Sequence, residues 1–327
     1  MLRCPSCLAD IFRDYNEISG HFIDMEEKSD ADHIMWLNRY ISKERISALE
    51  LSSRIEDFFR TDSLKKWIIE RMVKTFFSEK QHPFILAMQK PSKYTLAGYA
   101  FEHHHYFKQW VRSCSQIVAN TDIEDIQHFE IENIISEWQG LGPDFPSHHE
   151  LLLRMGESYG YKRSDIYNTE PLQATQKATE FWNAVCRNCS SVEGMAAMHS
   201  LELIANRNMK KYGASIGYFD PGILSNGSIT KEAVAFLKEG YEADISHSET
   251  ALDLMEKYSM DPDTKHNCLA IANLSIEKFS DYLDARLERG VNSSILPLSS
   301  SMIRYIRSIA ELLSAAIFGS YDFNRFQ

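Results

Sequence analysis

Residues 133–151 read NIISEWQGLGPDFPSHHEL. The first half carries Glu137 among apolar neighbours, and the glycines and prolines of residues 140–146 then break the helical pattern with turn chemistry. Ser147 precedes the next periodic segment, as a helix N-cap does, and His148 follows it directly. The stretch therefore predicts two helices and a loop, with a carboxylate before the loop and an imidazole after it.

The helical rhythm of this stretch extends over most of the chain. Apolar residues recur three and four positions apart, which is the period of an α-helix with one buried face. Segments with this period cover residues 46–59, 67–77, 117–134, 151–159, 174–185, 192–212, 231–258, 264–287 and 300–318. Alternating strand patterns are nearly absent. The sequence predicts an all-α protein, with a helical domain at 46–327 and a separate unit at 1–45.

The composition is that of an ordinary globular protein, with 327 residues, 44% hydrophobic and 25% charged. No apolar run approaches the roughly 20 residues that span a bilayer, and the N-terminus lacks the apolar core of a signal peptide. We therefore expect a cytoplasmic protein without a membrane segment. The net charge of −11 and the scattered Lys and Arg residues argue against a nucleic-acid partner. The apolar stripe of residues 302–318 suits either the core or the interface of a homodimer.

The N-terminal unit begins MLRCPSCLADIFRDYNEISGHFID over residues 1–24. Cys4 and Cys7 have C-x-x-C spacing, and His21 follows on a predicted short helix. This arrangement resembles the C2H2 zinc finger. Two thiolates together with imidazoles suit tetrahedral Zn²⁺, and so small a unit has too little core to fold without the metal. We therefore predict a zinc module at residues 1–45.

The fourth zinc ligand departs from the C2H2 pattern. That family places its second histidine three to five residues after the first, where this chain has Asp24, Met25 and Glu26. The next histidine is His33, which we expect to be the fourth ligand in preference to a water molecule or Asp24. The helix of this unit is acidic and would repel phosphate, so we expect a structural or interaction module rather than a reader of nucleic acid.

A second C-x-x-C pair is formed by Cys186 and Cys189. No histidine or cysteine lies near it in the sequence. It could complete a four-cysteine site with the first pair, or it could be two ordinary thiols at a helix end, which is the interpretation that we favour.

Three segments of the helical domain place a carboxylate and a histidine at positions i and i+3, on one face of a helix. The pairs are Glu102/His105, His199/Glu202 and Asp244/His247. Helical carboxylates and histidines that point into a bundle are the usual construction of di-iron and di-manganese centres. The pattern therefore indicates a buried metal site, to which Glu137 and His148 add a further carboxylate and imidazole.

These segments together resemble a known superfamily. Residues 133–140 followed by HHEL at 148–151 are similar to the "N-L-x-x-E-x-G … H-x-x-L-L" stretch of heme-oxygenase-like proteins, which include the TenA thiaminases, the pyrroloquinoline-quinone synthase and di-metal oxidases. FEHHHYFKQW at 101–110 resembles their early helix, and residues 236–247 resemble their last metal-binding helix. The resemblance covers about residues 80–260 and implies a heme-oxygenase-like helical bundle.

The oxidase branch of this superfamily implies a ligand set. Its metals are held by a Glu and a His, a mid-chain Glu, and a final H-x3-D-x2-H helix. The matching residues here, and hence the implied ligands and catalytic residues, are Glu137, His148, Glu202, Asp244 and His247. The first histidine of the final motif is replaced by Gly240.

The glycine leaves a gap in the implied ligand set. Substrate, water or another ligand could fill it, with His199, Glu102 and His105 as further candidates and Glu239 less well aimed. The resemblance therefore implies two irons, or one if the site is depleted at Gly240.

The implied activity is that of a non-heme di-iron, or other di-metal, oxygenase that activates O₂. Its substrate would be a small amino-acid-like or carboxylic-acid molecule inside apolar walls. Two alternatives remain open. One is a metal-free enzyme of the TenA or PqqC type, and thiaminase chemistry of the TenA kind would use Cys114 as the plausible nucleophile. The other is a helical scaffold protein with a zinc-finger docking head and a degenerate metal site.

Overall fold

The computed structural model describes residues 1–78, 80–142 and 144–295. The side chains of residues 10, 11, 242–247 and 293–295 lie outside this description, as does the predicted helix at 300–318. The all-α prediction is confirmed, with one two-stranded sheet as the addition. Within the described ranges, every helix is too short or too polar to traverse a lipid bilayer.

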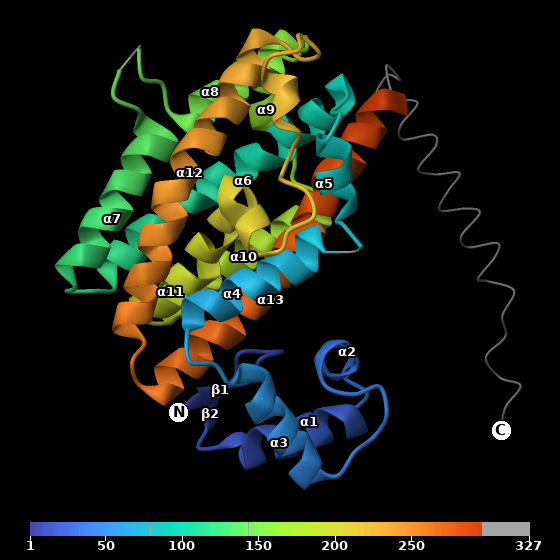
Figure 1. Ribbon diagram of the computed structural model, residues 1–327, viewed down its shortest axis with the longest axis vertical. Helices are drawn as coiled ribbons and strands as arrows, with labels where there is room; N and C mark the ends of the chain where they lie inside the picture. The colour runs from blue at the N-terminus through green and yellow to red at the C-terminus, as the bar shows by residue number, and fades with distance from the viewer. Residues whose placement is uncertain (79, 143, 296–327) are drawn as a thin grey trace, which may run out of the picture.

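The N-terminal head contains two short strands and three helices. Strand β1 (Leu2–Arg3) pairs antiparallel with β2 (Asp10–Phe12). Helices α1 (Tyr15–Glu27), α2 (Ala31–Tyr40) and α3 (Ala48–Phe59) follow. The predicted division at residue 45 falls in the loop between α2 and α3, and α3 packs on α1. The head lies at one end of the helical domain (Figure 1).

The helical domain is built around two long helices, α6 and α13, which pack along each other. Helices α10, α7 and α8 pack on α6, and α12 crosses over α8 (Figure 1). The elements are α4 (Leu64–Met72), η1 (Val73–Phe77), α5 (Pro83–Met88), α6 (Lys93–Ala119), α7 (Glu124–Ile134), η2 (Ile135–Gln139), α8 (His148–Ser158), α9 (Arg163–Asn168), α10 (Gln173–Asn188), α11 (Ser191–Met198), η3 (His199–Ile204), η4 (Arg207–Tyr212), η5 (Pro221–Leu224), α12 (Lys231–Tyr258) and α13 (Pro262–Ile295).

The α6–α13 contact depends on glycine. A Cβ atom added at Gly98 would lie 2.1 Å from the backbone oxygen of Arg286 and 2.5 Å from the backbone nitrogen of Gly290. Only the absence of a side chain allows the two backbones to approach so closely. This contact fixes the position of Arg286 relative to α6, and both Arg286 and α6 line the same cavity.

Two predicted helical segments are interrupted in the structure. The pattern at 117–134 is divided, because α6 ends at Ala119 and α7 begins at Glu124. Asn120 caps the break, and its side-chain Nδ2 donates to the carbonyl oxygen of Cys186, 2.8 Å away. The pattern at 192–212 is α-helical only as far as Met198 and then continues as the 3₁₀ segments η3 and η4. Apolar spacing alone does not distinguish these tighter turns from an α-helix.

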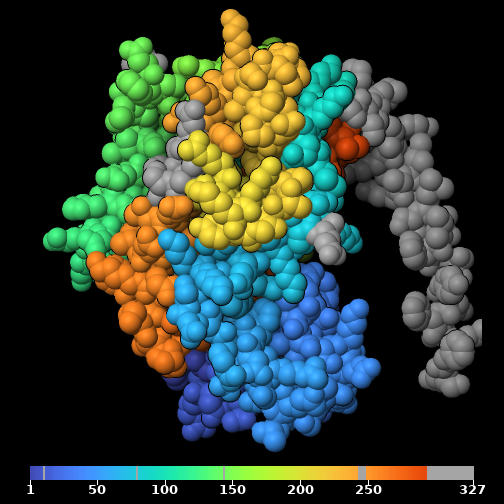
Figure 2. Space-filling model, in the orientation of Figure 1, coloured from blue at the N-terminus to red at the C-terminus, as the bar shows by residue number. Residues whose placement is uncertain are grey.

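The segment from η3 to η5 crosses one face of the helical domain. In Figure 2 the residues coloured yellow and gold cover the middle of this face, above the segment coloured light blue. Leu201, Ile204, Tyr218 and Phe219 of this crossing segment turn their side chains inward and are buried. The segment therefore closes a space between α6, α12 and α13.

Candidate metal centre and active-site cavity

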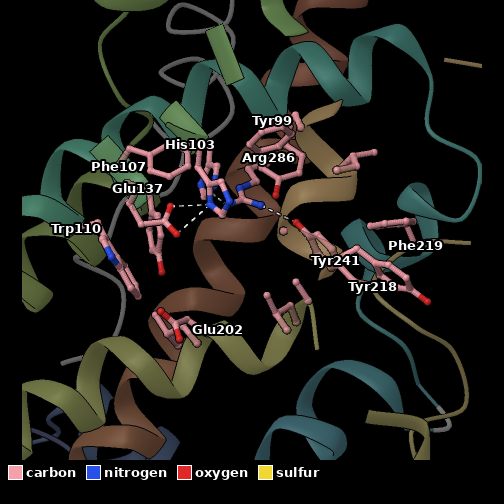
Figure 3. Close-up of a pocket in the computed structure, with 18 of the residues that line it drawn as sticks. Tyr99, His103, Phe107, Trp110, Glu137, Glu202, Tyr218, Phe219, Tyr241 and Arg286 are labelled. Carbon is pink, nitrogen blue, oxygen red and sulfur yellow. Dashed lines mark hydrogen bonds and ion pairs between the residues drawn. The ribbon is translucent and has the colours of Figure 1, made fainter. Parts of the chain in front are cut away.

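The space beneath the crossing segment is a cavity of about 90 Å³. At roughly 10–15 Å³ for each water molecule, it has room for several waters or one small ligand. Its walls come from α6, η2, α8, η3, α12 and α13 (Figure 3). Most of the lining is aromatic or aliphatic, and its ionisable members are His103, Glu137, His148, Glu202, Arg286 and four tyrosines. An apolar cavity with a few convergent polar groups is the usual form of a small-molecule site.

Glu137 and His148, the carboxylate and the imidazole predicted on either side of the loop at residues 140–146, meet in this cavity. Glu137 lies on the π-helical turn η2, and His148 begins α8, where the Ser147 side chain accepts from the Glu150 N–H as predicted. The chain reverses between them at Gly140, whose φ of 70° favours glycine. His148 Nδ1 lies 2.9 Å from the Glu137 carboxylate, and both side chains are largely buried. His148 Nε2 is also 3.8 Å from Glu239 of α12.

Glu202 reaches the same cavity from η3 and forms a second polar group with His199 and Glu130. His199 Nδ1 lies 3.1 Å from Glu202 Oε1, and His199 Nε2 lies 2.7 Å from Glu130 Oε1. Burial alone would lower the pKa of His199, but the two carboxylates outweigh it and raise the pKa to about 10. His199 is therefore an imidazolium held between two carboxylates. The Oε2 atoms of both glutamates are buried and have no hydrogen-bond partner among the described residues.

Glu130 was missed by the sequence analysis. It lies on α7, fully buried, seven residues before Glu137. Seven residues are about two helical turns, so the two carboxylates share a helix face, and this spacing was available in the sequence. An isolated glutamate among FEIE carried too little signal, because its partner His199 lies 69 residues further along the chain.

The donors around the cavity are of the types that bind a metal ion, although the ligand atoms of Glu137, His148 and Glu202 do not all lie within 4.8 Å of one another. Glu137, His148 and Glu202 supply two carboxylates and one imidazole, the ligand types that non-heme iron uses. The buried, unpartnered Oε2 of Glu202 is a donor without an assigned role. Asp244 and His247 belong to α12, but their side chains lie outside the described residues. Gly240 lines the cavity, so the position at which the implied motif would carry a histidine faces this space.

The pair Glu102/His105 is placed elsewhere. Glu102 is fully buried, but its carboxylate accepts hydrogen bonds from Arg289 Nε, at 2.6 Å, and from the Thr175 hydroxyl. His105 borders a different surface depression, on the α10 side of α6. Neither is among the described residues that line the cavity, whereas His103 of the same HHH run is. The structure therefore does not place these two further candidates beside the Glu137–His148 pair.

Cys114 is fully buried beside Glu130 and His199. The potential ligand atoms of these three residues all lie within 4.8 Å of one another. Burial and the charge of Glu130 raise the pKa of the Cys114 thiol well above its usual range. Cys114 is not among the described residues that line the cavity. A protonated thiol outside the cavity is poorly suited to act as the nucleophile of a metal-free enzyme.

The head gathers its four predicted zinc ligands at one point. The ligand atoms of Cys4, Cys7, His21 and His33 all lie within 4.8 Å of one another. Cys4 Sγ is 3.5 Å from His33 Nε2, Cys7 Sγ is 3.5 Å from His21 Nε2, and the two imidazole Nε2 atoms are 3.0 Å apart. This two-thiolate, two-imidazole set fits tetrahedral Zn²⁺. Cys186 and Cys189 do not belong to the cluster.

Asp30 orients one of these ligands. Its side chain caps α2 by accepting from the His33 N–H, and its Oδ1 also lies 2.7 Å from His33 Nδ1. A carboxylate on Nδ1 leaves Nε2 directed at the metal position and raises the basicity of the ring. The long loop between the two histidines is thus bridged by a helix cap that doubles as support for the ligand.

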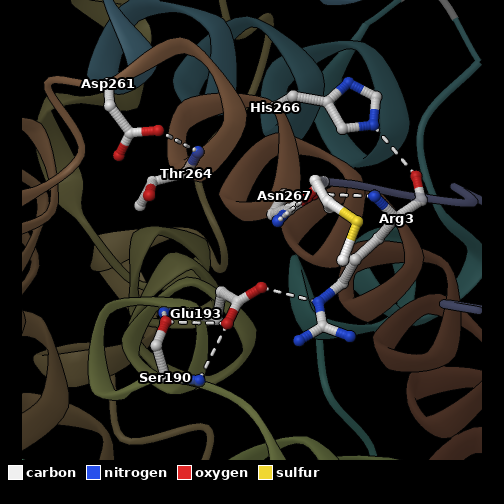
Figure 4. A network of polar contacts seen from close by, with 8 residues as sticks. Arg3, Ser190, Glu193, Asp261, Thr264, His266 and Asn267 are labelled. Carbon is white, nitrogen blue, oxygen red and sulfur yellow. Dashed lines mark hydrogen bonds and ion pairs between the residues drawn. The ribbon is translucent and has the colours of Figure 1, made fainter. Parts of the chain in front are cut away.

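The residue before Cys4 joins the head to the helical domain. The Arg3 backbone N–H donates to Asn267 Oδ1 of α13 at 2.8 Å, and its carbonyl oxygen lies 2.9 Å from His266 Nε2 (Figure 4). The Arg3 side chain reaches Glu193 at the start of α11, with 2.6 Å between Nε and Oε1. Glu193 also accepts from Ser190 in the capping box of α11. One residue of the head therefore contacts both α11 and α13.

His266 makes the stability of this junction dependent on pH. Burial lowers its pKa to about 4, against 6.5 for an exposed histidine. Between these pH values the unfolded chain binds a proton that the folded chain does not, so stability falls as the pH drops from 6.5 towards 4. We expect His266 to contribute a loss of about 2 kcal/mol in the free energy of unfolding between pH 7 and pH 5. Urea unfolding at both pH values, with His266→Gln as comparison, measures this loss, and an equal loss in the variant contradicts the assignment.

Comparison with known proteins identifies the family of each part of the chain. The sequence model of the TENA/THI-4/PQQC family matches residues 69–289, and that of a C2H2 type zinc-finger matches residues 1–60. No curated protein matches the sequence. The family match extends beyond residues 80–260, the range over which the resemblance was first apparent.

Solved structures share the fold. A domain of unknown function with a heme oxygenase-like fold from Shewanella denitrificans OS217 is 18% identical, with a TM-score of 0.50 over 75% of this chain and 94% of that chain. A TenA homologue from P. horikoshii OT3 is 12% identical, with a TM-score of 0.52 over 72% of this chain and 99% of that chain. A TenA homologue from Pseudomonas syringae pv. tomato str. DC3000 is 11% identical, with a TM-score of 0.51 over 72% of this chain and 92% of that chain.

At these identities the solved structures establish the heme oxygenase-like fold alone. The family model, in contrast, covers more than half of the chain and includes every helix that lines the cavity. The chain therefore belongs to the TENA/THI-4/PQQC family and carries a C2H2 type zinc-finger segment at its N-terminus.

Proposed function

We propose that the helical domain is a non-heme iron oxygenase or oxidase that acts on a small molecule. The observation that carries the proposal is the presence of Glu137, His148 and Glu202 in one largely aromatic cavity. Asp244 and His247 would complete the ligand set from α12. Iron bound there would supply the activation of O₂.

The residues of the chain have separate roles in this proposal. Glu137 and His148 lie in contact, so each fixes the orientation of the other. His199 holds Oε1 of Glu202 and leaves Oε2 available as a donor. Phe107, Trp110 and other aromatic walls exclude water, which strengthens the electrostatic interactions inside and protects a reactive oxidant from side reactions.

Gly240 gives the substrate room in this arrangement. A histidine at this position would project a ring into the cavity, whereas glycine leaves that volume open. The proposal therefore assigns the gap to part of the substrate. The thiaminase form of the metal-free alternative loses support, because Cys114 is a protonated thiol outside the cavity lining.

Substitution of the Glu137–His148 pair tests the proposal. We expect the chain purified from iron-supplemented culture to contain one or two irons in addition to about one zinc. Glu137→Gln and His148→Ala should each remove most of the iron, since loss of one ligand from so small a set leaves too few donors. Elemental analysis of zinc and iron in the same sample measures both metals, and the unchanged zinc content shows that the head has folded.

Matched controls come from the pair that lies outside the cavity. Glu102→Gln and His105→Ala change the same residue types on α6 and should leave the iron content of the folded protein unchanged. A wild-type chain that contains zinc alone after growth in iron-rich medium would refute the oxygenase proposal. Iron that is lost equally in the control variants would refute the ligand assignment.

A further inference from the structure

Arg286 of α13 carries a positive charge into the cavity wall. Its side chain is 1% exposed and lines the cavity on the side of Tyr99 and His103 (Figure 3). The guanidinium lies over the Tyr99 ring, 4.1 Å from the centroid, and 4.5 Å from that of Tyr282. The two rings hold its plane by cation–π contact without neutralising its charge.

Every hydrogen-bond partner of Arg286 is neutral. Its NH1 donates to the Tyr218 hydroxyl at 2.9 Å, and its NH2 donates to the Tyr282 hydroxyl at 2.7 Å and to His103 Nδ1 at 2.6 Å. Burial and the nearby guanidinium lower the pKa of His103 well below its usual range, so the ring is uncharged. Burial raises the pKa of both tyrosines. No carboxylate forms an ion pair with Arg286 among the described residues.

The hydrogen-bonding capacity of Arg286 is also incompletely used. A guanidinium has five N–H donors, and the three contacts above occupy three of them. Nε is buried and has no partner among the described residues. A buried charge without a counterion costs several kcal/mol, and an unpaired buried donor adds to this cost. Such an arrangement is expected where a ligand supplies the missing anion.

Two other arginines of the described residues, one buried and one partly buried, are compensated. Arg289, one turn further along α13, pairs with Glu102 at 2.6 Å. Arg71 is as enclosed by aromatic rings as Arg286, but the negative charge of Glu277 acts on it and Asn273 Oδ1 accepts from its Nε at 3.1 Å. Arg286 differs from these two arginines because no carboxylate among the described residues offsets its charge.

We propose that Arg286 is the binding site for the carboxylate of a monoanionic ligand with an aromatic or branched apolar body. One guanidinium balances one negative charge, whereas a phosphate dianion would leave excess negative charge near Glu137 and Glu202. Phe107, Trp110 and Phe236 supply apolar walls for the body of the ligand. The inference rests on the proposed function only in that both concern the same cavity, and Arg286 would anchor the molecule that the metal centre oxidises.

Binding of matched acid and amide probes tests the inference. The full-length chain, purified from iron-depleted medium with its zinc retained, is titrated calorimetrically with benzoate, phenylacetate, 4-methylpentanoate and phenyl phosphate, and with phenylacetamide. We expect the carboxylates to bind about tenfold or more tightly than the amide and the phosphate, because a charged hydrogen bond to a buried group contributes at this level. Arg286→Met should abolish the preference for carboxylate over amide.

Two further variants keep the test decisive. Arg71→Met removes another buried arginine outside the cavity and should retain the preference. Arg286→Lys keeps the positive charge but loses the planar guanidinium, which can donate two parallel hydrogen bonds to a carboxylate. This variant should therefore bind carboxylates more weakly and still prefer them to the amide. Replacement of an uncompensated buried charge by Met is expected to preserve folding. If it does not, the lysine variant alone decides, and carboxylate binding as tight as in the wild type would refute the role of Arg286.

The inference is overturned if acid and amide bind equally, if no carboxylate of the panel binds, or if Arg286→Met keeps the preference. These results are independent of iron. A chain that binds phenylacetate through Arg286 but never takes up iron would refute the oxygenase and retain the carboxylate site. A chain that holds iron at Glu137 and His148 but shows no preference for acids would support the oxygenase proposal and refute the carboxylate site.

Discussion

Replacing Cys4 with serine is expected to abolish zinc binding and to unfold the head. The head has few buried residues of its own, and structural zinc contributes about 10–16 kcal/mol of binding free energy to zinc-finger peptides. Because Arg3 precedes this ligand and joins α11 to α13, the helical domain should also unfold at a lower temperature. Elemental analysis should show a fall from about one zinc per chain to almost none, and calorimetry gives the change in midpoint.

Cys189→Ser is the matched control for this experiment. Cys189 ends α10 and is only partly buried, but it does not belong to the zinc cluster. Its replacement should leave the zinc content unchanged. Equal zinc loss in the two variants would show that the second C-x-x-C pair takes part in metal binding. Full zinc retention in Cys4→Ser would show that the head folds without this ligand.

The second large effect is expected at Gly98. A methyl group here meets the backbone of Arg286 and Gly290 at 2.1–2.9 Å, and backbone atoms cannot move aside as a flexible side chain can. Gly98→Ala should therefore force α13 away from α6, at a cost of about 3 kcal/mol or more in the free energy of unfolding. The displacement would also carry Arg286 out of position, so phenylacetate binding should weaken together with stability.

Gly20→Ala is the control, because it should raise the free energy of unfolding where Gly98→Ala lowers it. Gly20 lies within α1, and a Cβ atom there would have nothing within 4 Å. Alanine in an open helical position should stabilise the protein by up to about 1 kcal/mol. Urea unfolding compares the two variants directly. If Gly98→Ala is as stable as the wild type, the two central helices do not approach as closely as the structure places them.

The sequence predicted those parts of the molecule that depend on neighbouring residues in the chain. Helical periodicity located the helices, and the N-cap at Ser147 is confirmed. The zinc ligands Cys4, Cys7 and His21 lie within one short segment, so their spacing indicated their common purpose. Glu137 and His148 are separated by one loop and were also found together. All of the proposed iron ligands, this pair included, stay predictions, and the side chains of Asp244 and His247 lie outside the described residues.

The parts that were missed depend on contacts between distant segments. Nothing near Arg286 in the sequence distinguishes it from Arg289, yet one faces neutral tyrosines in the cavity and the other faces Glu102. Likewise, helical spacing could not decide which histidine of the HHH run enters the cavity, because that choice follows from how α6 is rotated against α13. Tertiary packing determined both outcomes, and the periodicity of a single helix does not contain this information.

The junction at Arg3 has a thermodynamic consequence. Zinc bound by the four ligands would order the segment that contains Cys4. The same segment is held by Asn267, His266 and Glu193, so metal binding and docking of the head form one closed cycle. In such a cycle, each process must strengthen the other by the same factor. A substitution such as Asn267→Ala, which removes no zinc ligand, must then raise the dissociation constant for zinc. The affinity of this chain for zinc is thus a property of both domains, and a free head peptide would underestimate it.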